Sequence, residues 1–330
     1  MRTTAKPLTV RARIERWPLA KPFKIARGVK TEAVTVVVEA SDGAHTGRGE
    51  CTPYARYGET PDGVLERIET MDPVRDRTEL QQTLAPGAAR NAVDCAIWDL
   101  EAKRTGKPVA ELAGLSPPAS AVTAYTLSLD TPEAMAKAAA EAQRPVLKVK
   151  LGERDIDLEA ARLRAIAKAA PAAKLIVDAN EGWDAETLAA MDPVCSEIDA
   201  LFIEQPLPAS EDDVIKGMGL KTRICADESC HVIHDLEHLH GKYEVANIKL
   251  DKTGGLTAAI ELRSAATAQG FEIMIGCMVA GSLAMAPAYL LSEGALAVDL
   301  DGPLLLAEDR QPGIRFDGAT MSTPPQVLWG

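Results

Sequence analysis

The sequence predicts an α/β protein: a (β/α)8-type barrel that follows an N-terminal α+β domain and precedes a short C-terminal segment. Two observations predict this class. Eight short apolar runs recur between residues 124 and 297 at intervals of 22 to 28 residues, and alanine-rich or charged stretches of helical pattern fill most intervals. Before residue 116 the pattern differs, because β-branched runs are followed there by a separate helix.

Residues 1–115 are assigned to the α+β domain. Residues 34–40 (VTVVVEA) form a β-branched run that ends at a turn signal, and residues 8–14 alternate, so the two predict a small antiparallel sheet. Residues 86–104 begin at Pro86 and stop before Gly106, with apolar residues at helical spacing. They predict a helix, and GRGE at 47–50 is interpreted as a turn.

Residues 116–305 are assigned to the barrel. Its eight predicted strands are the runs AYTLS, VLKVKL, LIVDAN, ALFIEQP, RICADES, ANIKLD, EIMIG and ALAVDLD. Residues 273–292 carry no charge, but they contain two glycines and a proline, so we interpret them as a buried strand, a loop and a buried helix rather than a membrane span. Residues 306–330 do not continue the repeat and are expected to return to the N-terminal domain.

Composition narrows the class of function. The chain has 330 residues and a net charge of −12, which argues against binding to nucleic acid or to an anionic membrane. A metal ion or a cationic substrate fits better. Six cysteines spread over this length predict reduced, mostly buried thiols and a cytoplasmic protein. The first 23 residues contain no apolar core of a signal peptide.

Three carboxylates end successive predicted strands: Asp178, Glu204 and Asp227. Catalytic groups of a (β/α)8 barrel project from these strand ends. Carboxylates that converge without His or Cys suit Mg²⁺, with Mn²⁺ as the second possibility. The alternative is that each carboxylate caps the following helix. Asn180 and Gln205 stand beside two of the carboxylates and are expected to support them.

Three lysines lie inside apolar strands. Lys148 and Lys150 are two residues apart and share one face of their strand, while Lys249 lies four strands away across the barrel mouth. Two neighbouring ammonium groups are expected to depress each other's pKa, which would make one of them a base. Bases on both sides of a metal suit proton abstraction beside a carboxylate, with inversion of configuration. The alternative for each lysine is a solvated surface position.

The motifs LKVKL, IVDAN, IEQP, ICADES and NIKLDKTGG, in this order, resemble the enolase superfamily, in particular its muconate-lactonizing-like branch. The resemblance covers nearly the whole chain and implies that the N-terminal domain caps the barrel. It implies that Lys150 and Lys249 are the acid/base pair and that Lys148 steadies the substrate carboxylate. It also implies the three carboxylates as Mg²⁺ ligands, an enediolate intermediate and a homo-oligomer.

The stretch VDLDGPL, with Asp299 and Asp301, resembles the motif with which dipeptide epimerases bind the substrate ammonium group. KPFKIARG resembles the mobile loop that closes over the substrate, and Arg27, then Lys24, is the candidate for an acidic side chain. Three further segments resemble the Ala-Glu epimerases: GECTPYARYGE, AARNAVDCAIWDL and CADESCH. The implied substrate is L-Ala-D/L-Glu, and the implied role is recycling of cell-wall peptides.

Two other classes stay open. A cycloisomerase or a dehydratase similar to o-succinylbenzoate synthase would need the same metal and lysines without the two aspartates. A non-catalytic metal-binding protein would need the lysines to be structural. A zinc site in the His- and Cys-rich residues 225–240 is disfavoured, because no second matched ligand pair follows. His231, His234 and His238 would share a helix face there, and Gly254-Gly255 is interpreted as a turn that leaves room for substrate.

Overall fold

The computed structural model describes residues 6–25 and 27–330, so residues 1–5 of the predicted N-terminal domain lie outside it. The N-terminal domain contains a three-stranded antiparallel sheet of order β1-β2-β3. Its strands are β1 (Thr9–Ile25), β2 (Gly28–Ser41) and β3 (Thr46–Cys51). Its helices are η1 (Ala55–Tyr57), α1 (Pro61–Glu69), α2 (Arg77–Thr83), α3 (Ala88–Thr105) and α4 (Val109–Ala113). The predicted sheet and the predicted helix at 86–104 are confirmed.

Helix α3 packs directly on β3. A Cβ atom at Gly47 would lie 2.1 Å from the carbonyl oxygen of Ala96, and one at Gly49 would lie 2.1 Å from that of Ala92. Only glycine lets the two backbones come this close. The interpretation of residues 47–50 as a turn is therefore wrong: they form a strand whose glycines serve helix packing.

The barrel has eight parallel strands in sequential order, so the predicted strands are confirmed. They are β5 (Tyr125–Leu127), β6 (Val146–Lys150), β7 (Lys174–Asp178), β8 (Phe202–Glu204), β9 (Ile224–Ala226), β10 (Val245–Ile248), β11 (Glu272–Gly276) and β12 (Ala297–Asp299). The barrel is nearly closed, because Ala124 N donates to the carbonyl of Val298 beside the first and last strands, at 2.7 Å.

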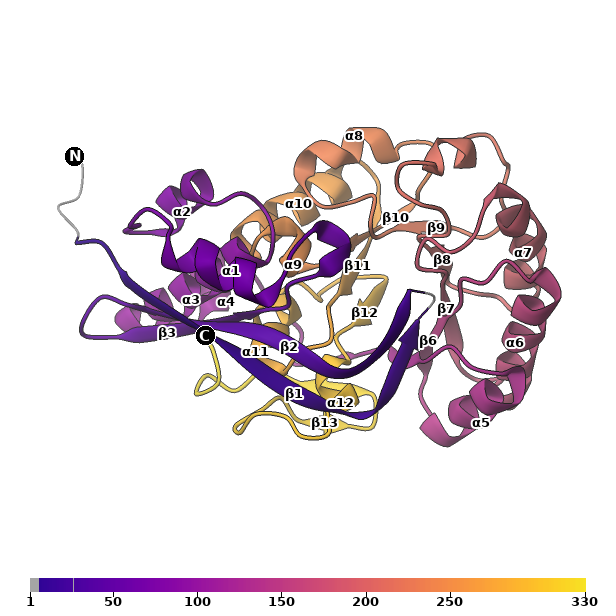
Figure 1. The fold of residues 1–330 in the computed structure, drawn as a ribbon, viewed down its shortest axis with the longest axis horizontal. Helices are drawn as coiled ribbons and strands as arrows, with labels where there is room; N and C mark the ends of the chain where they lie inside the picture. Colours follow the sequence, from indigo (N-terminus) through magenta and orange to yellow (C-terminus); the bar gives the residue numbers. More distant parts are fainter. Residues whose placement is uncertain (1–5, 26) are drawn as a thin grey trace.

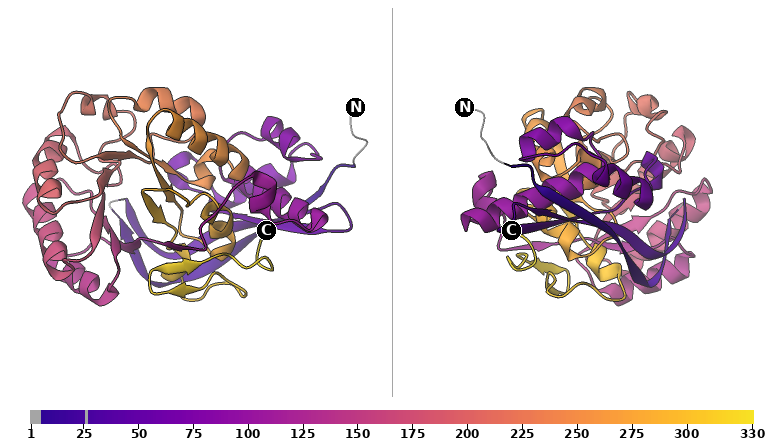
Figure 2. Two further views of the ribbon diagram at one scale, coloured as in Figure 1. Left: turned by 180° about the vertical axis from the view of Figure 1, so that it is seen from behind. Right: turned by 60° about the vertical axis from the view of Figure 1, so that its left-hand side comes forward.

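Helices cover most of the outside of the barrel (Figures 1 and 2). They are α5 (Pro132–Ala142), α6 (Ile156–Ala169), α7 (Ala185–Glu197), α8 (Leu236–Leu239), α9 (Leu250–Thr253), α10 (Leu256–Ala268), α11 (Ser282–Tyr289) and α12 (Gly302–Leu305). The first three begin at the capping side chains of Thr131, Asp155 and Asp184. The connections from β8 and from β9 hold only the short helices η2 (Asp212–Ile215), η3 (Ile233–Asp235) and α8.

The inside of the barrel is layered. An apolar cluster with members in seven of the repeats closes the N-terminal end of the strands: Ala124, Ile176, Phe202, Cys225, Val245, Met274 and Ala297. Charged side chains follow two residues further along several strands, as the alternation of a strand requires. This apolar layer lies between the charged side chains and the N-terminal end of the barrel, and it excludes water on that side.

The C-terminal residues contact both parts of the molecule. Strand β14 (Thr320–Ser322) pairs with β13 (Phe316–Asp317) and with β4 (Ser120–Val122) next to the barrel. The last residues lie on α3, where the indole of Trp329 donates to the carbonyl of Cys95 at 3.0 Å and Gly330 N donates to Asp99 Oδ1 at 2.9 Å. The assignment of residues 1–115, 116–305 and 306–330 to three separate segments remains a prediction.

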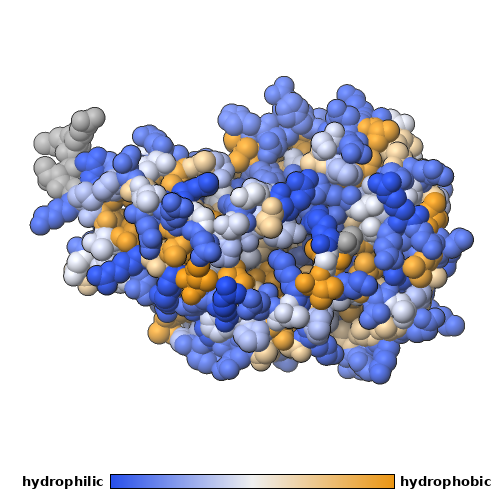
Figure 3. Space-filling model, viewed as in Figure 1, coloured by the Kyte–Doolittle hydropathy of each residue, from blue (hydrophilic) through white to orange (hydrophobic). Residues whose placement is uncertain are grey.

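The residues proposed as a buried strand, a loop and a buried helix form β11 and α11, which confirms that interpretation. Within residues 6–25 and 27–330, no helix has both the length and the apolar character to cross a bilayer. The face shown in Figure 3 is mainly hydrophilic, with apolar side chains in small separate patches. All six cysteines are free, and all except Cys277 are fully buried.

Removing the Arg310 side chain is expected to weaken the junction between the C-terminal segment and the N-terminal sheet. Arg310 Nη2 bonds Glu50 Oε2 at 3.0 Å, and the Glu50 side chain has no exposed surface. Arg310→Met would leave this carboxylate buried and unpaired, which should lower the free energy of unfolding by about 3 kcal/mol. Urea unfolding followed by circular dichroism measures the change.

The matched control is Arg164→Met, because Arg164 forms an ion pair with Glu197 and both side chains are about half exposed. That loss should stay below about 1 kcal/mol. Equal losses in the two variants would show that the Arg310 pair is no stronger than a surface pair.

Candidate active site

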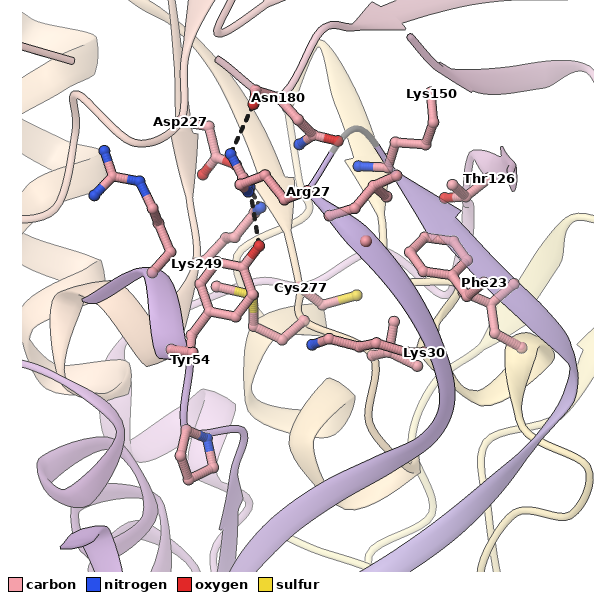
Figure 4. Close-up of a pocket in the computed structure, with 18 of the residues that line it drawn as sticks. Phe23, Arg27, Lys30, Tyr54, Thr126, Lys150, Asn180, Asp227, Lys249 and Cys277 are labelled. Atoms are coloured by element: carbon pink, nitrogen blue, oxygen red, sulfur yellow. Dashed lines mark hydrogen bonds and ion pairs between the residues drawn. The ribbon is translucent and has the colours of Figure 1, made fainter. Parts of the chain in front are cut away.

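A cavity of about 620 Å³ lies between the tip of the β1–β2 hairpin and the C-terminal ends of the barrel strands (Figure 4). The N-terminal domain thus supplies one wall and the barrel the other. The cavity is lined by seven of the ten predicted site residues: Arg27, Lys148, Lys150, Asp227, Lys249, Asp299 and Asp301. Asp178 and Glu204 lie beneath it, bonded to the lysines. Lys24 is outside this lining.

The three predicted metal-ligand carboxylates occupy neighbouring strands. Asp178 ends β7, its register partner Glu204 ends β8, and Asp227 follows β9 directly. Each is at most 2% exposed. Neighbouring strands lie about 4.8 Å apart, so the three side chains share one small region of the barrel mouth.

Each of these carboxylates is bonded to a lysine. Lys150 Nζ lies 2.6 Å from Asp178 Oδ2, and Lys249 Nζ lies 2.6 Å from Asp227 Oδ2. Lys148 Nζ lies 2.8 Å from Glu204 Oε2. In the described part of the chain, no three His, Cys, Asp or Glu side chains are already gathered around one metal position. The ammonium groups hold the oxygens that a metal ion would need.

This pairing sets the pKa values. Burial alone would raise the pKa of Asp178, but Lys150 and Lys148 lower it to about 2. Burial alone would lower the pKa of Lys148, but the surrounding carboxylates of Asp299, Glu204 and Asp178 raise it well above its usual value. The prediction that the two lysines depress each other's pKa is therefore wrong for Lys148, because three carboxylates outweigh one neighbouring ammonium group.

The donor set fits a hard divalent cation. Six carboxylates are buried at the barrel mouth: Asp178, Glu204, Asp227, Glu228, Asp299 and Asp301. Four lysine ammonium groups are buried with them: Lys148, Lys150, Lys249 and Lys252. Arg27 at the rim offsets one more negative charge, so a negative excess remains. Burial and the charge of Asp178 raise the pKa of Glu204 to about 7, and an added cation would oppose this rise.

Lys150 and Lys249 enter the cavity from different sides (Figure 4). Lys150 ends β6, and Lys249 directly follows β10, four strands further round the barrel. Burial alone would lower the pKa of Lys249, but the charge of Asp227 raises it. This direction favours the ammonium form of Lys249.

Arg27 and Lys24, the predicted partners of an acidic substrate side chain, are not both available in the main cavity. Arg27 is engaged on every side: it donates to the carbonyl of Asn180 at 2.7 Å, to Tyr54 OH at 2.9 Å and to Glu228 Oε1 at 2.8 Å. Lys24 lines a neighbouring cavity of about 830 Å³ instead. The sequence analysis missed Lys30, which extends into the main cavity beside Cys277 (Figure 4).

Lys30 is a cationic side chain of the N-terminal domain that lines the cavity without a carboxylate partner in the described part of the chain. Its Nζ lies 5.1 Å from the centre of the Tyr54 ring, and no carboxylate among the described residues forms an ion pair with it. Partial burial and the nearby charge of Arg27 lower the pKa of Lys30, although the residue keeps an exposed surface. Alternation along β2 does not reveal this, because the strand is solvent-exposed up to Glu32.

Asp299, which ends β12, and Asp301 line the cavity on its barrel side. Asp299 Oδ2 accepts from Lys148 Nζ at 2.9 Å, while its Oδ1 is buried without a hydrogen-bond donor in the described structure. Asp301 Oδ2 accepts from Thr126 N at 2.7 Å. Burial and the charge of Asp299 raise the pKa of Asp301 to about 7. The free oxygen of Asp299 can accept from a ligand.

Unusual backbone conformations occur beside the carboxylates. Asn180, Glu181 and Gln205 have φ values of 47°, 64° and 35°, in the left-handed region that favours glycine. Gln205 Oε1 accepts from Asp227 N at 2.9 Å, and Asn180 N donates to Asp178 Oδ1 at 2.9 Å. Both residues thus support carboxylates of the site, Gln205 through its side chain and Asn180 through its backbone.

The loop after Lys249 is held by helix α3. Arg90 donates to the carbonyls of Thr253 and Gly254, at 2.7 and 3.0 Å. A Cβ atom at Gly255, whose φ is 112°, would lie 2.5 Å from Asp94. The interpretation of the two glycines as room for substrate is therefore wrong, because they serve contact with the N-terminal domain. Asp251 in this loop accepts from Asn91 Nδ2 at 2.8 Å.

The His- and Cys-rich residues do not form one helix. Only η3 and α8 occur there, so the predicted shared face of His231, His234 and His238 is wrong. The ring of His231 packs against Tyr57 at 4.5 Å, and burial lowers its pKa to about 4. His240 bonds Gln269 Oε1 at 2.9 Å. The histidines of this segment thus contact neighbouring side chains, and no group of three potential metal ligands occurs among the described residues.

Two family models match this chain. Residues 8–114 match the mandelate racemase / muconate lactonizing enzyme N-terminal domain, and residues 131–313 match the enolase C-terminal domain-like model. The chain therefore belongs to the mandelate racemase and muconate lactonizing enzyme group of the enolase superfamily. The relatives described next are isomerases.

The chain is 46% identical to L-Ala-D/L-Glu epimerase of Escherichia coli strain K12, over 93% of this chain and 97% of that one. It is 47% identical to N-acetyl-D-glutamate racemase of a Pseudoalteromonas species, over 89% and 95%. Among solved structures, an enolase family member from Agrobacterium tumefaciens, with bound sodium and L-Ala-L-Glu, has a TM-score of 0.93 at 48% identity and covers 98% of this chain and 100% of that chain.

A dipeptide epimerase of Enterococcus faecalis, complexed with Mg and L-Leu-L-Tyr, has a TM-score of 0.88 at 27% identity, over 96% of this chain and 97% of that chain.

Asp251→Asn is expected to change how stability depends on pH. Burial and nearby acidic charges raise the pKa of Asp251 to about 7. A carboxyl whose folded pKa exceeds its unfolded value, about 3.9, stabilises the fold most at low pH and loses this contribution as pH rises through 7. The stability of the variant relative to the natural protein should therefore rise as the pH increases from about 4 to about 7 and stay constant above that. Urea unfolding at several pH values measures this.

Asp72→Asn is the control, because Asp72 is exposed. A wild-type pH profile that Asp251→Asn leaves unchanged would contradict the assignment.

Proposed function

We propose that this protein is a Mg²⁺-dependent dipeptide epimerase whose substrate is L-Ala-D/L-Glu. The observation that supports this most is the placement of Lys150 and Lys249 on different sides of one cavity, with buried carboxylates between them. A single α-carbon held there has a lysine on each face, and that is what inversion of configuration requires. The names and ligands of the relatives support the substrate class.

Asp178, Glu204 and Asp227 would hold the Mg²⁺ ion. When bound, the ion would supply positive charge that stabilises the substrate carboxylate as it gains electron density. Lys148 would support the same carboxylate, because its ammonium form is strongly favoured. The excess of buried carboxylates over buried ammonium groups supports this assignment.

The two lysines would exchange one proton each. The neutral amine of Lys150 would take the α-proton of the C-terminal residue, and the C–H electron pair would pass into the carboxylate as an enediolate. The ammonium of Lys249 would return a proton to the other face, leaving Lys249 neutral and Lys150 charged. The reverse direction exchanges the roles. The hairpin tip, held over the cavity by Arg27, would keep bulk water out.

The two remaining ends of the dipeptide need opposite charges. Asp299 and Asp301 would bind the α-ammonium group, and the free Oδ1 of Asp299 supports this. Lys30 would bind an acidic side chain. It replaces Arg27 and Lys24 in this role, because Arg27 is already bonded to Glu228 and Lys24 lines another cavity.

Variants of the two lysines should separate the two faces. Lys150→Ala and Lys249→Ala should each lower epimerisation by about 10³-fold, because each removes one acid/base group. Each variant should still exchange the α-proton of one diastereomer, and the two variants should prefer opposite diastereomers. Proton NMR of L-Ala-L-Glu and L-Ala-D-Glu in D₂O with Mg²⁺ measures both. Exchange of both diastereomers by either variant would contradict the two-base arrangement.

Asp301→Asn tests which class of substrate the site serves. For a dipeptide the change should lower kcat/KM by about 10²-fold, because a charged hydrogen bond to the ammonium group is lost. An N-acetylated glutamate has no ammonium group, and a relative 47% identical is an N-acetyl-D-glutamate racemase. Undiminished activity of the variant on dipeptides, or higher wild-type activity on N-acetylglutamate, would favour that second function. Rates on dicarboxylate substrates test the lyase alternative.

Lys30→Met should remove the preference for an acidic C-terminal residue. We expect kcat/KM for L-Ala-L-Glu to fall by at least about tenfold, since one charge-assisted bond is lost, while that for L-Ala-L-Met stays constant or rises. Lys24→Met is the matched control and should leave the ratio of the two unchanged. If Arg27→Met changed this ratio and Lys30→Met did not, the original assignment to Arg27 would be restored.

A further inference from the structure

Lys252 is a buried lysine that the proposed mechanism does not use. It lies in α9, three residues after Lys249, and its side chain has no exposed surface. Its Nζ donates to Asp227 Oδ1 at 2.7 Å, to the carbonyl of Asp227 at 2.5 Å and to the carbonyl of Asn247 at 2.9 Å. An ammonium group has three N–H donors, so all of them are used. Lys252 therefore has no donor left for a substrate.

Every polar atom of Asp227 has a partner in this arrangement. Its N–H donates to Gln205 Oε1, and Lys252 takes both its carbonyl and Oδ1. Only Oδ2 is bonded to a residue that lines the cavity, namely Lys249. Lys252 thus binds Oδ1 on the side away from the cavity and restrains the rotamer of the Asp227 side chain. The other oxygen, Oδ2, is left facing the cavity.

We propose that Lys252 is a positioning residue for the metal site: it holds Asp227 in the orientation in which Oδ2 can bind Mg²⁺. This inference rests on the proposed function, since it assumes that Asp227 is a metal ligand. Without Lys252, Asp227 Oδ1 would be buried without a donor, while the Asp227 carbonyl would keep the bond from Cys230 N at 3.1 Å. The carboxylate would then be free to rotate.

The sign of the effect separates positioning from simple charge. A cation beside the metal repels it, so removing the charge of Lys252 would tighten metal binding if charge were its only contribution. Positioning predicts the opposite result. Binding of Mn²⁺, measured without substrate from the EPR signal of the free ion, gives this sign directly and does not depend on turnover.

The experiment compares Lys252→Met with Arg90→Met. Arg90 is also a buried cation that bonds carbonyls of the loop after Lys249, but it does not contact Asp227. We expect Lys252→Met to weaken Mn²⁺ binding by about 10- to 100-fold, as removal of groups that orient ligands does, and Arg90→Met to stay close to the natural protein. Added to Asp227→Asn, Lys252→Met should weaken binding no further.

Unchanged or tighter Mn²⁺ binding by Lys252→Met would overturn the proposal, and so would equal weakening by Arg90→Met. If Lys252→Met does not fold by circular dichroism, Lys252→Gln replaces it, because the amide keeps donors without the charge. Loss of folding in both variants would also overturn the proposal, since Lys252 would then be a structural residue. Absence of Mn²⁺ binding in the natural protein would instead contradict the proposed function.

Discussion

The structure depends on the pairing of six buried carboxylates with four buried lysine side chains at one end of the barrel. Without the four buried lysines, the burial of Asp178, Glu204 and Asp227 would cost far more than the fold could supply. The apolar layer beneath them excludes water, which strengthens every ion pair and also raises the cost of each unpaired charge. In the proposed function, a divalent cation would bind carboxylate oxygens that the lysines now hold.

The N-terminal domain completes the site from two directions. The hairpin tip covers the cavity through Arg27, which bonds residues that follow β7 and β9. Helix α3 holds the loop that begins at Lys249, through Arg90, Asp94 and Asn91. One lysine of the proposed pair is thus anchored by the other domain, whereas Lys150 sits within a barrel strand. A change at the domain interface should therefore act on Lys249 before it acts on Lys150.

Much of the site could be predicted from the sequence because most of its residues lie in or directly after a short apolar strand, and such a strand is visible in a few consecutive residues. The period of the apolar runs placed Asp178, Glu204 and the lysines at matching points of the repeat. Positions that depend on distant partners could not be predicted. Gly49 is interpreted as part of a turn because its contact with α3 cannot be seen in the sequence, and nothing in the sequence indicates that Lys252 is buried beside Asp227. Lys30 and Arg27 are three residues apart, and the structure distinguishes them because Arg27 has an acidic partner across the cavity, Glu228, whereas Lys30 forms no ion pair among the described residues.

The most direct test of the account is proton NMR of L-Ala-L-Glu in D₂O with the purified protein and Mg²⁺. The account predicts that the α-proton signal of the glutamate disappears while L-Ala-D-Glu appears, and that addition of EDTA stops both. An α-proton signal that persists for this and for other dipeptides would contradict the account, since two lysines facing one α-carbon could not leave that proton in place.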